Sequence, residues 1–459
     1  MVSESAVTAL RNRADKPGTF AVVTYGCQMN ARDGETIASL LTACGLVKAD
    51  RAEAELLVFN TCCVRDNAER RALGNIRRAA HDKRSRPGMM IAVCGCMAQE
   101  SGESAGRVFP GADIVFGTHN ILRLPEYLLR ALDERQPVAD IWNEAGSSGD
   151  GTIEDAEDIA AEGSVGHKAF VIVMRGCDNF CSYCVVPYVR GRERSRPMDE
   201  ILRECEGLLA AGVKELTLLG QNVNSYGVGL EGGATFAGLL RAVAGLGAPR
   251  VRFMTSHPKD LSDELIATMA DVPAVCNHIH LPVQSGSDRV LSLMNRRYNR
   301  ERYMERVGSL RRAVPDVGIT TDLIVGFPGE TDADFDDTLS LVEEARFDAA
   351  YTFVYSPRAG TKAASMLGRV PEEVSRERIA RLIAAQESST ARVFAGLIGS
   401  ERIVLADEPA RRSAGGVSGR IDRGISVTLP GGEDLIGRFV PARIVSAGHN
   451  TLRGVILEG

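Results

Sequence analysis

Three cysteines lie within eight residues of this chain, and their spacing limits what the segment can fold around. Cys177, Cys181 and Cys184 form the pattern CxxxCxxC. Three thiolates can hold three irons of a 4Fe-4S cube, which leaves one iron without a protein ligand. A structural zinc site closes its tetrahedron with a fourth Cys or His, and none follows in the next stretch of chain. The spacing therefore favours an open iron-sulfur cluster over zinc or a disulfide.

The chain has the composition of a soluble globular protein. Its 459 residues are enough for two or three domains, and 44% hydrophobic with 25% charged residues is an ordinary balance. The first twenty residues lack the apolar segment of a signal peptide, and the apolar run at 169–174 is too short to cross a bilayer. We therefore expect a cytoplasmic protein without a membrane partner, whose eleven cysteines are thiols or metal ligands rather than disulfides.

Acidic residues are concentrated in one segment. The formal net charge of −6 argues at first sight against a nucleic-acid partner. However, residues 147–163 contribute six acidic side chains and no Lys or Arg, so the rest of the chain is balanced and can carry basic faces. This acidic stretch, which is rich in Gly and Ser, is predicted to be a linker between domains.

Arginines gather at three places in the sequence. Two clusters, within 70–86 and 296–302, are typical of solvated faces. The other begins six residues after Cys184, and this closeness to the metal loop makes it a candidate clamp for RNA phosphates. The predicted RNA-binding residues are Arg190, Arg192, Arg194 and Arg196.

Short β-rich runs alternate with helical stretches from Phe20 to about Glu134. This alternation is typical of parallel strands with helices on both faces, so residues 18–135 are predicted to form a doubly wound α/β domain. Cys27, Cys62 and Cys96 follow three of its strands. Loops after parallel strands open at one edge of the sheet, so these thiols should converge there as a second metal site.

Any single cysteine can also be a small buried apolar residue. We favour this interpretation where the surrounding pattern is apolar, at Cys44, Cys205 and Cys276. Two neighbours compete with the chosen ligands. Cys62 is preferred to Cys63 because it is the first residue after its strand, which leaves Cys63 as a bystander. Cys96 is preferred because Gly95 frees the backbone beside it, whereas Cys94 should point into the core of the sheet.

The remaining chain predicts two further folds. Strand-like runs near 168–175, 213–219, 250–255, 276–281, 317–325 and 347–354 are each followed by a helical segment. Residues 164–395 are therefore predicted to form a partial β/α barrel, with the CxxxCxxC loop after its first strand. A long helical region covers 371–398. Residues 398–459 contain five short β runs separated by turns, which predicts a small RNA-binding β-barrel.

Several motifs resemble the radical S-adenosylmethionine (SAM) enzymes, and among them the methylthiotransferase family. The motifs are TYGCQMN (24–30), FNTC (59–62), GCDNFCSYCVVPYVRGRERSRP (176–197), LLGQNVNSYG (218–227), HLPVQSGSDRVLSLMNR (280–296) and DLIVGFPGET (322–331). The resemblance covers nearly the whole length, and its last part implies a barrel of the TRAM type. The first and fourth motifs favour the MiaB-type branch, which acts on isopentenyl-adenosine in tRNA. The chain departs from the family pattern at Gly34, Cys63 and Cys94.

The resemblance implies a reaction and its cofactors. A methylthio group is placed on carbon 2 of 6-isopentenyl-adenosine next to the anticodon of tRNA. One SAM supplies a methyl group to sulfur at the N-terminal 4Fe-4S cluster, and a second SAM, bound at the CxxxCxxC cluster, supplies the radical that removes hydrogen from the base. Such a C–H bond has no acidic proton, so side chains alone cannot open it and a cofactor must. The base must leave its stack, and the two clusters are expected to face one cavity.

The resemblance also implies weaker site residues. The predicted cofactor-binding residues are Tyr183, Gly220, Asn222, Gln284, Gly326 and Gly329. The glycines can also be explained as turn residues. Asn222 and Gln284 can also be explained as structural hydrogen-bonding groups. Three histidines in or beside barrel strands, His257, His278 and His280, are taken as structural. The implied partners are the substrate tRNA and an electron donor, and we expect a monomer.

Two alternatives remain at this level. One is a methylthiotransferase that acts on threonylcarbamoyl-adenosine in tRNA or on a ribosomal protein, since those branches share the cysteines. The other belongs to a different class: an RNA-binding protein whose cysteines hold structural zinc.

Overall fold

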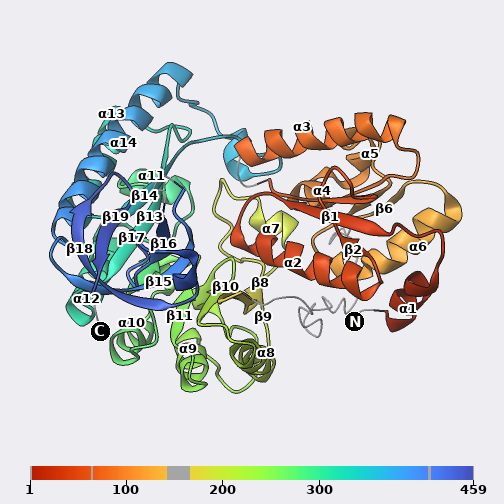
Figure 1. The fold of residues 1–459 in the computed structure, drawn as a ribbon. Coiled ribbons are helices and arrows are strands. Elements are labelled where there is room, and N and C mark those ends of the chain that lie inside the picture. The colour runs from red at the N-terminus through yellow and green to blue at the C-terminus, as the bar shows by residue number, and fades with distance from the viewer. Residues whose placement is uncertain (1–2, 64–65, 142–165, 412–414, 458–459) are drawn as a thin grey trace. The chain divides into compact units, whose positions relative to one another are not determined.

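The structure is a computed structural model of the chain that describes residues 3–63, 66–141, 166–411 and 415–457 (Figure 1). By their internal contacts the residues form two units. The first comprises 1–164 with 175–178 and 185–192, and the second comprises the rest. The predicted linker at 147–163 lies outside the described residues. Among the described helices, none has the length and apolarity of a membrane span.

The first unit is built on a parallel six-stranded sheet of order β2-β1-β3-β4-β5-β6. The strands are β1 (Thr19–Thr24), β2 (Val47–Lys48), β3 (Leu56–Thr61), β4 (Met90–Gly95), β5 (Ile114–Phe116) and β6 (Val138–Asp140). The chain adds β2 on one side of β1 and all later strands on the other. The topological switch point, where such sheets build their sites, therefore lies between β1 and β3.

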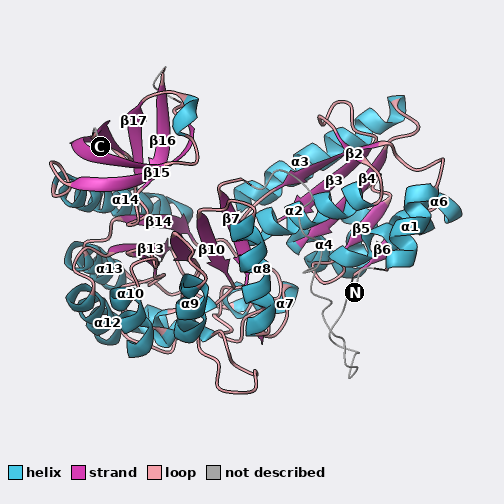
Figure 2. Cartoon of the chain, turned by 60° about the horizontal axis from the view of Figure 1, so that its bottom comes forward, coloured by secondary structure: helices cyan, strands magenta, loops and turns pink. Residues whose placement is uncertain are grey.

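Helices cover both faces of this sheet, as the sequence predicts (Figure 2). One core contains residues of α1 (Glu4–Asn12), α2 (Gln28–Ala43) and α6 (Leu124–Glu134), and the other contains residues of α3 (Asp66–Asp82), α4 (Cys96–Ser101) and α5 (Ala105–Val108). Strand β3 shows why the sheet is two-sided. Leu56 and Val58 belong to the first core, whereas Leu57 and Phe59 belong to the second, because successive side chains of a strand point to opposite faces.

The sequence misses three elements of this unit and one boundary. Strands β2 and β6 have two and three residues and lie at the edges of the sheet, so neither leaves a recognisable pattern. Helix α1 precedes the alternation that begins at Phe20. Helix α2 begins at Gln28, and the sequence pattern does not mark this start because the first turns of the helix are polar and show no apolar periodicity.

The second unit begins with six parallel strands, each within a run that the sequence predicts. They are β7 (Lys168–Ile172), β10 (Glu215–Leu219), β11 (Arg250–Phe253), β12 (His278–His280), β13 (Gly318–Val325) and β14 (Ala349–Val354). They form two sheets, β11-β10-β7 and β12-β13-β14, and a parallel bridge between Val251 and Val275 joins the two sequentially adjacent edges. The arrangement is an open β/α barrel.

Helices surround these strands on the outside (Figure 2). They are α8 (Met198–Ala210), α9 (Phe236–Gly245), α10 (Asp263–Asp271), α11 (Asp288–Leu293), α12 (Arg300–Ala313), α13 (Asp332–Ala345) and α14 (Glu372–Ala395). Three short elements follow the first strand: β8 (Met174–Arg175), α7 (Val186–Val189) and β9 (Arg194–Ser195).

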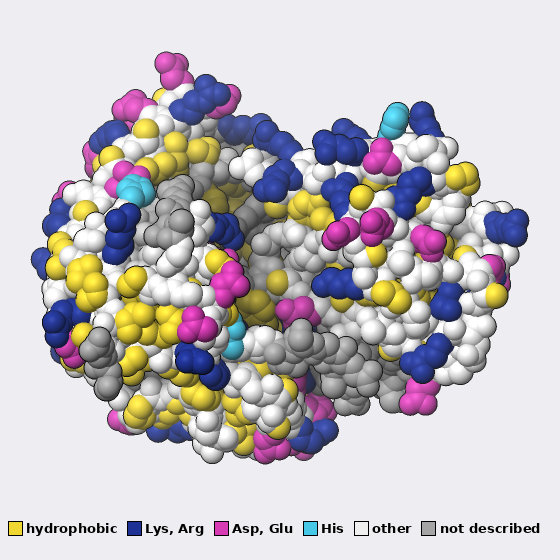
Figure 3. Space-filling view, in the orientation of Figure 1, with side chains coloured by type: hydrophobic (Ala, Val, Ile, Leu, Met, Phe, Trp, Pro, Cys, Tyr) yellow, Lys and Arg dark blue, Asp and Glu magenta, His cyan; other side chains and the backbone are white. Residues whose placement is uncertain are grey.

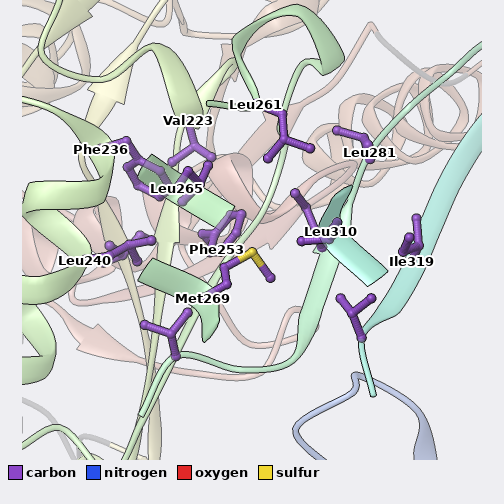
Figure 4. Packing of buried hydrophobic residues seen from close by; sticks show 14 of the residues in the cluster. Val223, Phe236, Leu240, Phe253, Leu261, Leu265, Met269, Leu281, Leu310 and Ile319 are labelled. Carbon is purple, nitrogen blue, oxygen red and sulfur yellow. The ribbon is translucent and has the colours of Figure 1, made fainter. Parts of the chain in front are cut away.

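One continuous apolar core supports the barrel (Figure 4). Phe236 of α9 meets Phe253 of β11 edge to face, with ring centroids 5.2 Å apart. Leu265 and Met269 of α10 fill the same layer. Dense packing of this kind resists deformation, so the strand ends that carry the site loops have a rigid base.

The last five strands close a small barrel of order β15-β16-β17-β19-β18, which confirms the prediction for this region. They are β15 (Glu401–Pro409), β16 (Gly416–Arg420), β17 (Ser426–Pro430), β18 (Phe439–Ala447) and β19 (Leu452–Ile456). In β18, Val440, Ala442 and Ile444 are buried while the residues between them are exposed. This alternation lines one barrel interior.

The turn between β16 and β17 is seated against the amino ends of the β/α barrel strands. Arg252 of β11 donates hydrogen bonds to the carbonyl oxygens of Ile421 and Asp422, at 2.6 and 2.8 Å. A Cβ on Gly424 would come within 2.9 Å of the His278 ring, so only glycine allows this approach. The β-barrel is therefore a docked part of the second unit.

Candidate functional site

The three N-terminal cysteines follow adjacent strands at one edge of the sheet. Cys27 is the N-cap of α2 after β1, Cys62 follows Thr61 at the end of β3, and Cys96 opens α4 after β4. Register pairs Thr24 with Asn60 and Thr61 with Gly95, so the ends of the three strands lie side by side. The sequence prediction that the loops after these three strands open at one edge of the sheet is confirmed.

Two glycines allow the strand ends to approach. Gly26 has φ +103°, and a Cβ there would lie 2.5 Å from the Cys62 sulfur. Cys62 therefore lies directly against the residue before Cys27. Gly95 has φ +91°, and a Cβ there would lie 2.3 Å from the carbonyl oxygen of Thr61. The prediction that Gly95 frees the backbone beside Cys96 is confirmed.

Asn30 holds the same strand ends together from within α2. Its side-chain amide donates to the carbonyl oxygens of Tyr25 and Thr61, at 2.9 and 2.8 Å. These two residues come shortly before Cys27 and directly before Cys62. Asn30 is fully buried, so its hydrogen bonds fix the loop geometry without competition from water.

The remaining cysteines of this unit differ in role. Cys94 and Cys44 lie in the core beneath α2, and burial raises the pKa of both thiols, as expected for inert core residues. Cys63 is not isolated, because its thiol is hydrogen-bonded to Cys96 and both belong to the core beneath α3. The hydrogen bond from Cys63 lowers the pKa of Cys96, and Arg190 lowers it further despite burial.

In this structure Arg190 is buried and cannot contact RNA phosphates. Its side chain is only 4% exposed, and its guanidinium donates to Asp33 and Asn30, each at 2.7 Å. Arg175 donates to the second oxygen of Asp33 at 3.2 Å. Burial alone raises the pKa of the Asp33 carboxyl, but Arg190 and Arg175 outweigh it and keep the group ionised.

The other three arginines predicted to contact RNA phosphates differ in burial. Arg196 is buried, and it donates to Glu204 at 2.7 Å and to a backbone carbonyl. Arg192 is 60% exposed and pairs with Asp178 at 3.2 Å, and Arg194 is half-buried. Only these two remain candidates for RNA contact. The basic cluster on α3 is a solvated face as predicted, with Arg70, Arg71, Arg77 and Arg78 exposed (Figure 3).

The N-terminal residues fit an iron-sulfur cluster in their chemistry. The donors are three soft thiol sulfurs at one sheet edge, beside a buried cation that stabilises thiolate. In the described parts of the chain all eleven cysteines are free, and no three Cys, His, Asp or Glu side chains form a ready-made cage for a metal ion. Ligation by Cys96 therefore requires its hydrogen bond with Cys63 to give way to iron.

The CxxxCxxC loop is held by side chains that sequence reasoning missed. Within the second unit, Asn295 donates to the carbonyl oxygens of Asn179 and Phe180, at 3.2 and 2.9 Å. The next residue, Arg296, donates to the sulfur of Cys181 at 3.3 Å. Arg296 is 4% exposed, although the arginine cluster at 296–302 is predicted from sequence to be a solvated face. Its closeness to a Cys can be seen only in the fold.

Arg296 also anchors two tyrosines beside this loop. It contacts the hydroxyl of Tyr183 at 3.4 Å and that of Tyr298 at 2.9 Å. Burial raises the pKa of both phenols, so they stay neutral hydrogen-bonding groups. Within the same unit the amide of Cys184 donates to the carbonyl oxygen of Cys181 at 2.9 Å. Cys177 belongs by its contacts to the first unit, and its amide donates to Gly191.

The predicted glycines are occupied by contacts of the protein itself. A Cβ on Gly220 would lie 2.5 Å from the Met174 side chain. Gly326 has φ +73°, and a Cβ there would lie 2.4 Å from the Ser375 hydroxyl. Gly329 has φ +82° and donates to Gly368 at 2.7 Å. These observations favour the turn and packing interpretation of all three.

Polar atoms without partners gather at the carboxyl ends of β10 and β11. Asn222 donates to Asp260 at 2.8 Å, but its Oδ1 is buried with no hydrogen-bond partner among the described residues. The same holds for Ser256 Oγ and His257 Nε2. Burial lowers the pKa of His257, so the ring is neutral. Buried polar atoms in native proteins nearly always have partners, so these three mark a place where a ligand can supply them.

Gln284 and the other two histidines complete the barrel interior. Gln284 adopts φ +74° and bridges to Leu323, so its backbone is part of the sheet. A left-handed conformation at a non-glycine residue is typical of functional sites. His278 and His280 hydrogen-bond to the hydroxyl of Thr320 at 3.1 and 3.0 Å, which supports their structural interpretation. The apolar interpretation also holds for Cys205 and Cys276, which are buried.

Comparisons with known proteins match all three parts of the chain. Residues 19–117 match the Uncharacterized protein family UPF0004, residues 171–342 the Radical SAM superfamily, and residues 397–457 the TRAM domain. A solved radical S-adenosylmethionine methyltransferase, TsrM from Kitasatospora setae, is similar in fold, with a TM-score of 0.53 and 15% identity over 76% of this chain and 74% of that one.

Relatives align with nearly the whole sequence. Proteins named tRNA-2-methylthio-N(6)-dimethylallyladenosine synthase are 47% identical in Syntrophomonas wolfei, covering 97% of this chain and 99% of the relative. They are 46% identical in Acetivibrio thermocellus, covering 97% and 92%, and 45% in Clostridium perfringens, covering 98% and 100%. The resemblance found in the motifs is confirmed, and the chain belongs to the tRNA-2-methylthio-N(6)-dimethylallyladenosine synthase family of radical SAM enzymes.

Proposed function

We propose that this enzyme adds a methylthio group to carbon 2 of 6-isopentenyl-adenosine next to the anticodon of tRNA, with two 4Fe-4S clusters and SAM. The observation that carries the proposal is the pair of cysteine triplets, one at the carboxyl edge of the parallel sheet and one in the loop after the first barrel strand. When bound, the clusters and SAM supply radical and sulfur-transfer chemistry that side chains lack. The proposed ligands are Cys27, Cys62 and Cys96, and Cys177, Cys181 and Cys184.

The chain's own residues bind and orient the reactants in this proposal. Asn222, Ser256 and His257 offer buried hydrogen-bonding atoms at the barrel's carboxyl end, where SAM or the adenine base can satisfy them. Neutral His257 accepts a hydrogen bond from the Lys259 amide at Nδ1, at 3.3 Å, so its Nε2–H can donate one to the ligand without charge. Gln284 and Tyr183 stay proposed cofactor contacts, and Asn295 with Arg296 keeps the Cys181 loop in place.

The wider setting of the enzyme is also proposed. The domain boundaries are 18–135, 164–395 and 398–459, with the linker at 147–163. The partners are tRNA and an electron donor, and the protein is a cytoplasmic monomer. The base is expected to leave its stack to reach the reactive cofactors.

Nucleoside analysis of tRNA tests the substrate. A strain that lacks the gene is expected to lose 2-methylthio-isopentenyl-adenosine and to accumulate isopentenyl-adenosine, because the C2–H bond is no longer opened. Mass spectrometry of digested tRNA measures both nucleosides, and a plasmid copy should restore the modified one. If the loss affects methylthio-threonylcarbamoyl-adenosine or a ribosomal protein instead, one of the sister substrates is the right one.

Salt dependence of tRNA binding tests the remaining RNA contacts. The double variant Arg192→Gln/Arg194→Gln is expected to bind tRNA more weakly and to lower the slope of log K against log salt by about 1.4, at about 0.7 per phosphate contact. Filter binding over a range of salt concentrations measures this slope. Arg203→Gln, which removes an exposed arginine paired with Asp199 on α8, is the matched control. Equal slopes for the two variants would remove these residues from the interface.

A further inference from the structure

Arg190 is a buried charge at the edge of the N-terminal sheet. It lies in the segment 185–192, which packs with the first unit, and Thr118 anchors this segment by donating to the carbonyl oxygen of Val189 at 2.7 Å. Asp33 and Asn30 each accept a hydrogen bond from its guanidinium at 2.7 Å. Two accepting groups fix the guanidinium fork, and both acceptors are themselves buried.

The fixed guanidinium faces two of the three cysteines. Arg190 donates a hydrogen bond to Cys96, and after Asp33 its main electrostatic partners are Cys96 and Cys27. Its acceptor Asn30 holds the backbone just before Cys27 and before Cys62. One hydrogen-bonded chain therefore joins Arg190 to all three strand ends that carry the predicted ligands.

Two cations meet at Asp33 beside the strand ends. Asp33 is ionised and is paired with two arginines, Arg190 and Arg175. A cluster held by three thiolates is anionic, and the potential of such clusters depends on net charge and on hydrogen bonds to sulfur.

We propose that Arg190 is a positioning residue for the N-terminal cluster, where its guanidinium, oriented by Asp33 and Asn30, hydrogen-bonds the Cys96 sulfur and offsets the negative charge of the cluster. This role rests on the proposed function and adds to it a residue that sets the potential of one cluster. It also explains why an arginine of a basic run is buried in the first unit.

Redox titration of the isolated N-terminal cluster tests this role. The triple variant of Cys177, Cys181 and Cys184 to Ala carries only that cluster, and spectroscopic titration gives its midpoint potential. In this background, Arg190→Gln is expected to lower the potential, because a positive charge beside the cluster is lost. Arg190→Lys keeps the charge and should restore most of the shift. Asp33→Asn removes a negative charge and should raise the potential.

Opposite shifts in these variants distinguish electrostatic positioning from a structural role. Arg196→Gln is the matched control, because Arg196 is as buried as Arg190 and is paired with Glu204 in the second unit. It should leave the potential unchanged. If Arg190→Gln cannot hold a cluster, Asp33→Asn tests the role instead. A rise in the midpoint potential supports it, and a fall overturns it. No shift, or the same shift for Arg190→Gln and Arg196→Gln, overturns the role. A triple variant without iron instead overturns the N-terminal cluster itself.

Discussion

Cys62→Ala and Cys96→Ala are each expected to remove about half of the iron and sulfide from the anaerobically reconstituted enzyme and to abolish product formation. The estimate of one half follows from one full cube at each cysteine triplet. Cys63→Ala and Cys94→Ala are expected to keep the full iron content. Iron and sulfide quantification on the four variants, prepared side by side, measures the difference.

The geometry of the strand ends gives the reason for this contrast. Cys62 lies against Gly26 beside Cys27, and it belongs to none of the apolar clusters of the described residues. Cys96 receives a hydrogen bond from Arg190, which favours its thiolate. Cys94, in contrast, points into the core beneath α2, where burial raises its pKa. A thiol in that position cannot reach the edge of the sheet.

Cys63 is the sharper of the two controls, because it contacts Cys96 directly. If Cys63 is a ligand and Cys62 is not, Cys63→Ala will lose the iron and Cys62→Ala will keep it. The variant of Cys177, Cys181 and Cys184 to Ala completes the series. It should also keep about half of the iron but should lose reductive cleavage of SAM. A protein that instead holds zinc at both triplets would show no iron-sulfur absorption in any variant.

Much of the architecture follows from pattern. The alternation of β-rich and helical runs predicts the parallel sheet, the six barrel strands and the five-stranded C-terminal barrel, because buried parallel strands read as continuous apolar runs. The edge strands β2 and β6 do not follow from it, since two or three residues carry no period. The strand order is also absent from the pattern. It is the order that puts the loops of Cys27 and Cys62 next to each other.

The arginines show what sequence reasoning cannot reach. Arg190, Arg196 and Arg296 all belong to basic runs, and such runs are usually solvated. The structure buries all three. The reason lies in partners that the run does not contain: Asp33 is 157 residues from Arg190, and Cys181 is 115 residues from Arg296. Burial of a charge depends on such distant partners, so it becomes visible only when the fold brings them together.

Arg252→Met is expected to destabilise the second unit by about 3–5 kcal/mol, because the buried Glu215 carboxylate loses the nearer of its two cations and keeps only Arg250, at 3.7 Å, while two backbone carbonyl oxygens lose their donor. Arg252 and Glu215 are 7% and 5% exposed, and the guanidinium donates to Glu215 at 2.8 Å. The same side chain holds the carbonyl oxygens of Ile421 and Asp422 in the β16–β17 turn. The substitution therefore removes one side of an ion pair and two links to the C-terminal barrel at once.

Thermal unfolding followed by circular dichroism measures this effect. At roughly 2 °C or more per kcal/mol for a unit of this size, the midpoint should fall by at least about 6 °C. Arg443→Met is the matched control on the same barrel, since Arg443 pairs with Glu401 at the surface, where such pairs contribute at most about 1 kcal/mol. A similar small shift for both variants would contradict the docking role of Arg252.

A second substitution separates the buried charge from the lost links. In Arg252→Met/Glu215→Gln the carboxylate that only the more distant Arg250 compensates is gone, so part of the stability should return, while the carbonyl oxygens of the turn still lack their donor. Recovery to the wild-type midpoint would mean that the ion pair alone matters. Partial recovery is the expected result, because Arg423 still pairs with Asp348 at 2.6 Å and keeps the turn seated on the strands of the β/α barrel. Arg252 of β11 ties this turn to Glu215 of β10, and these two strands carry the His257 and Asn222 loops at their carboxyl ends, so the docked barrel also stiffens the scaffold of the proposed cofactor site.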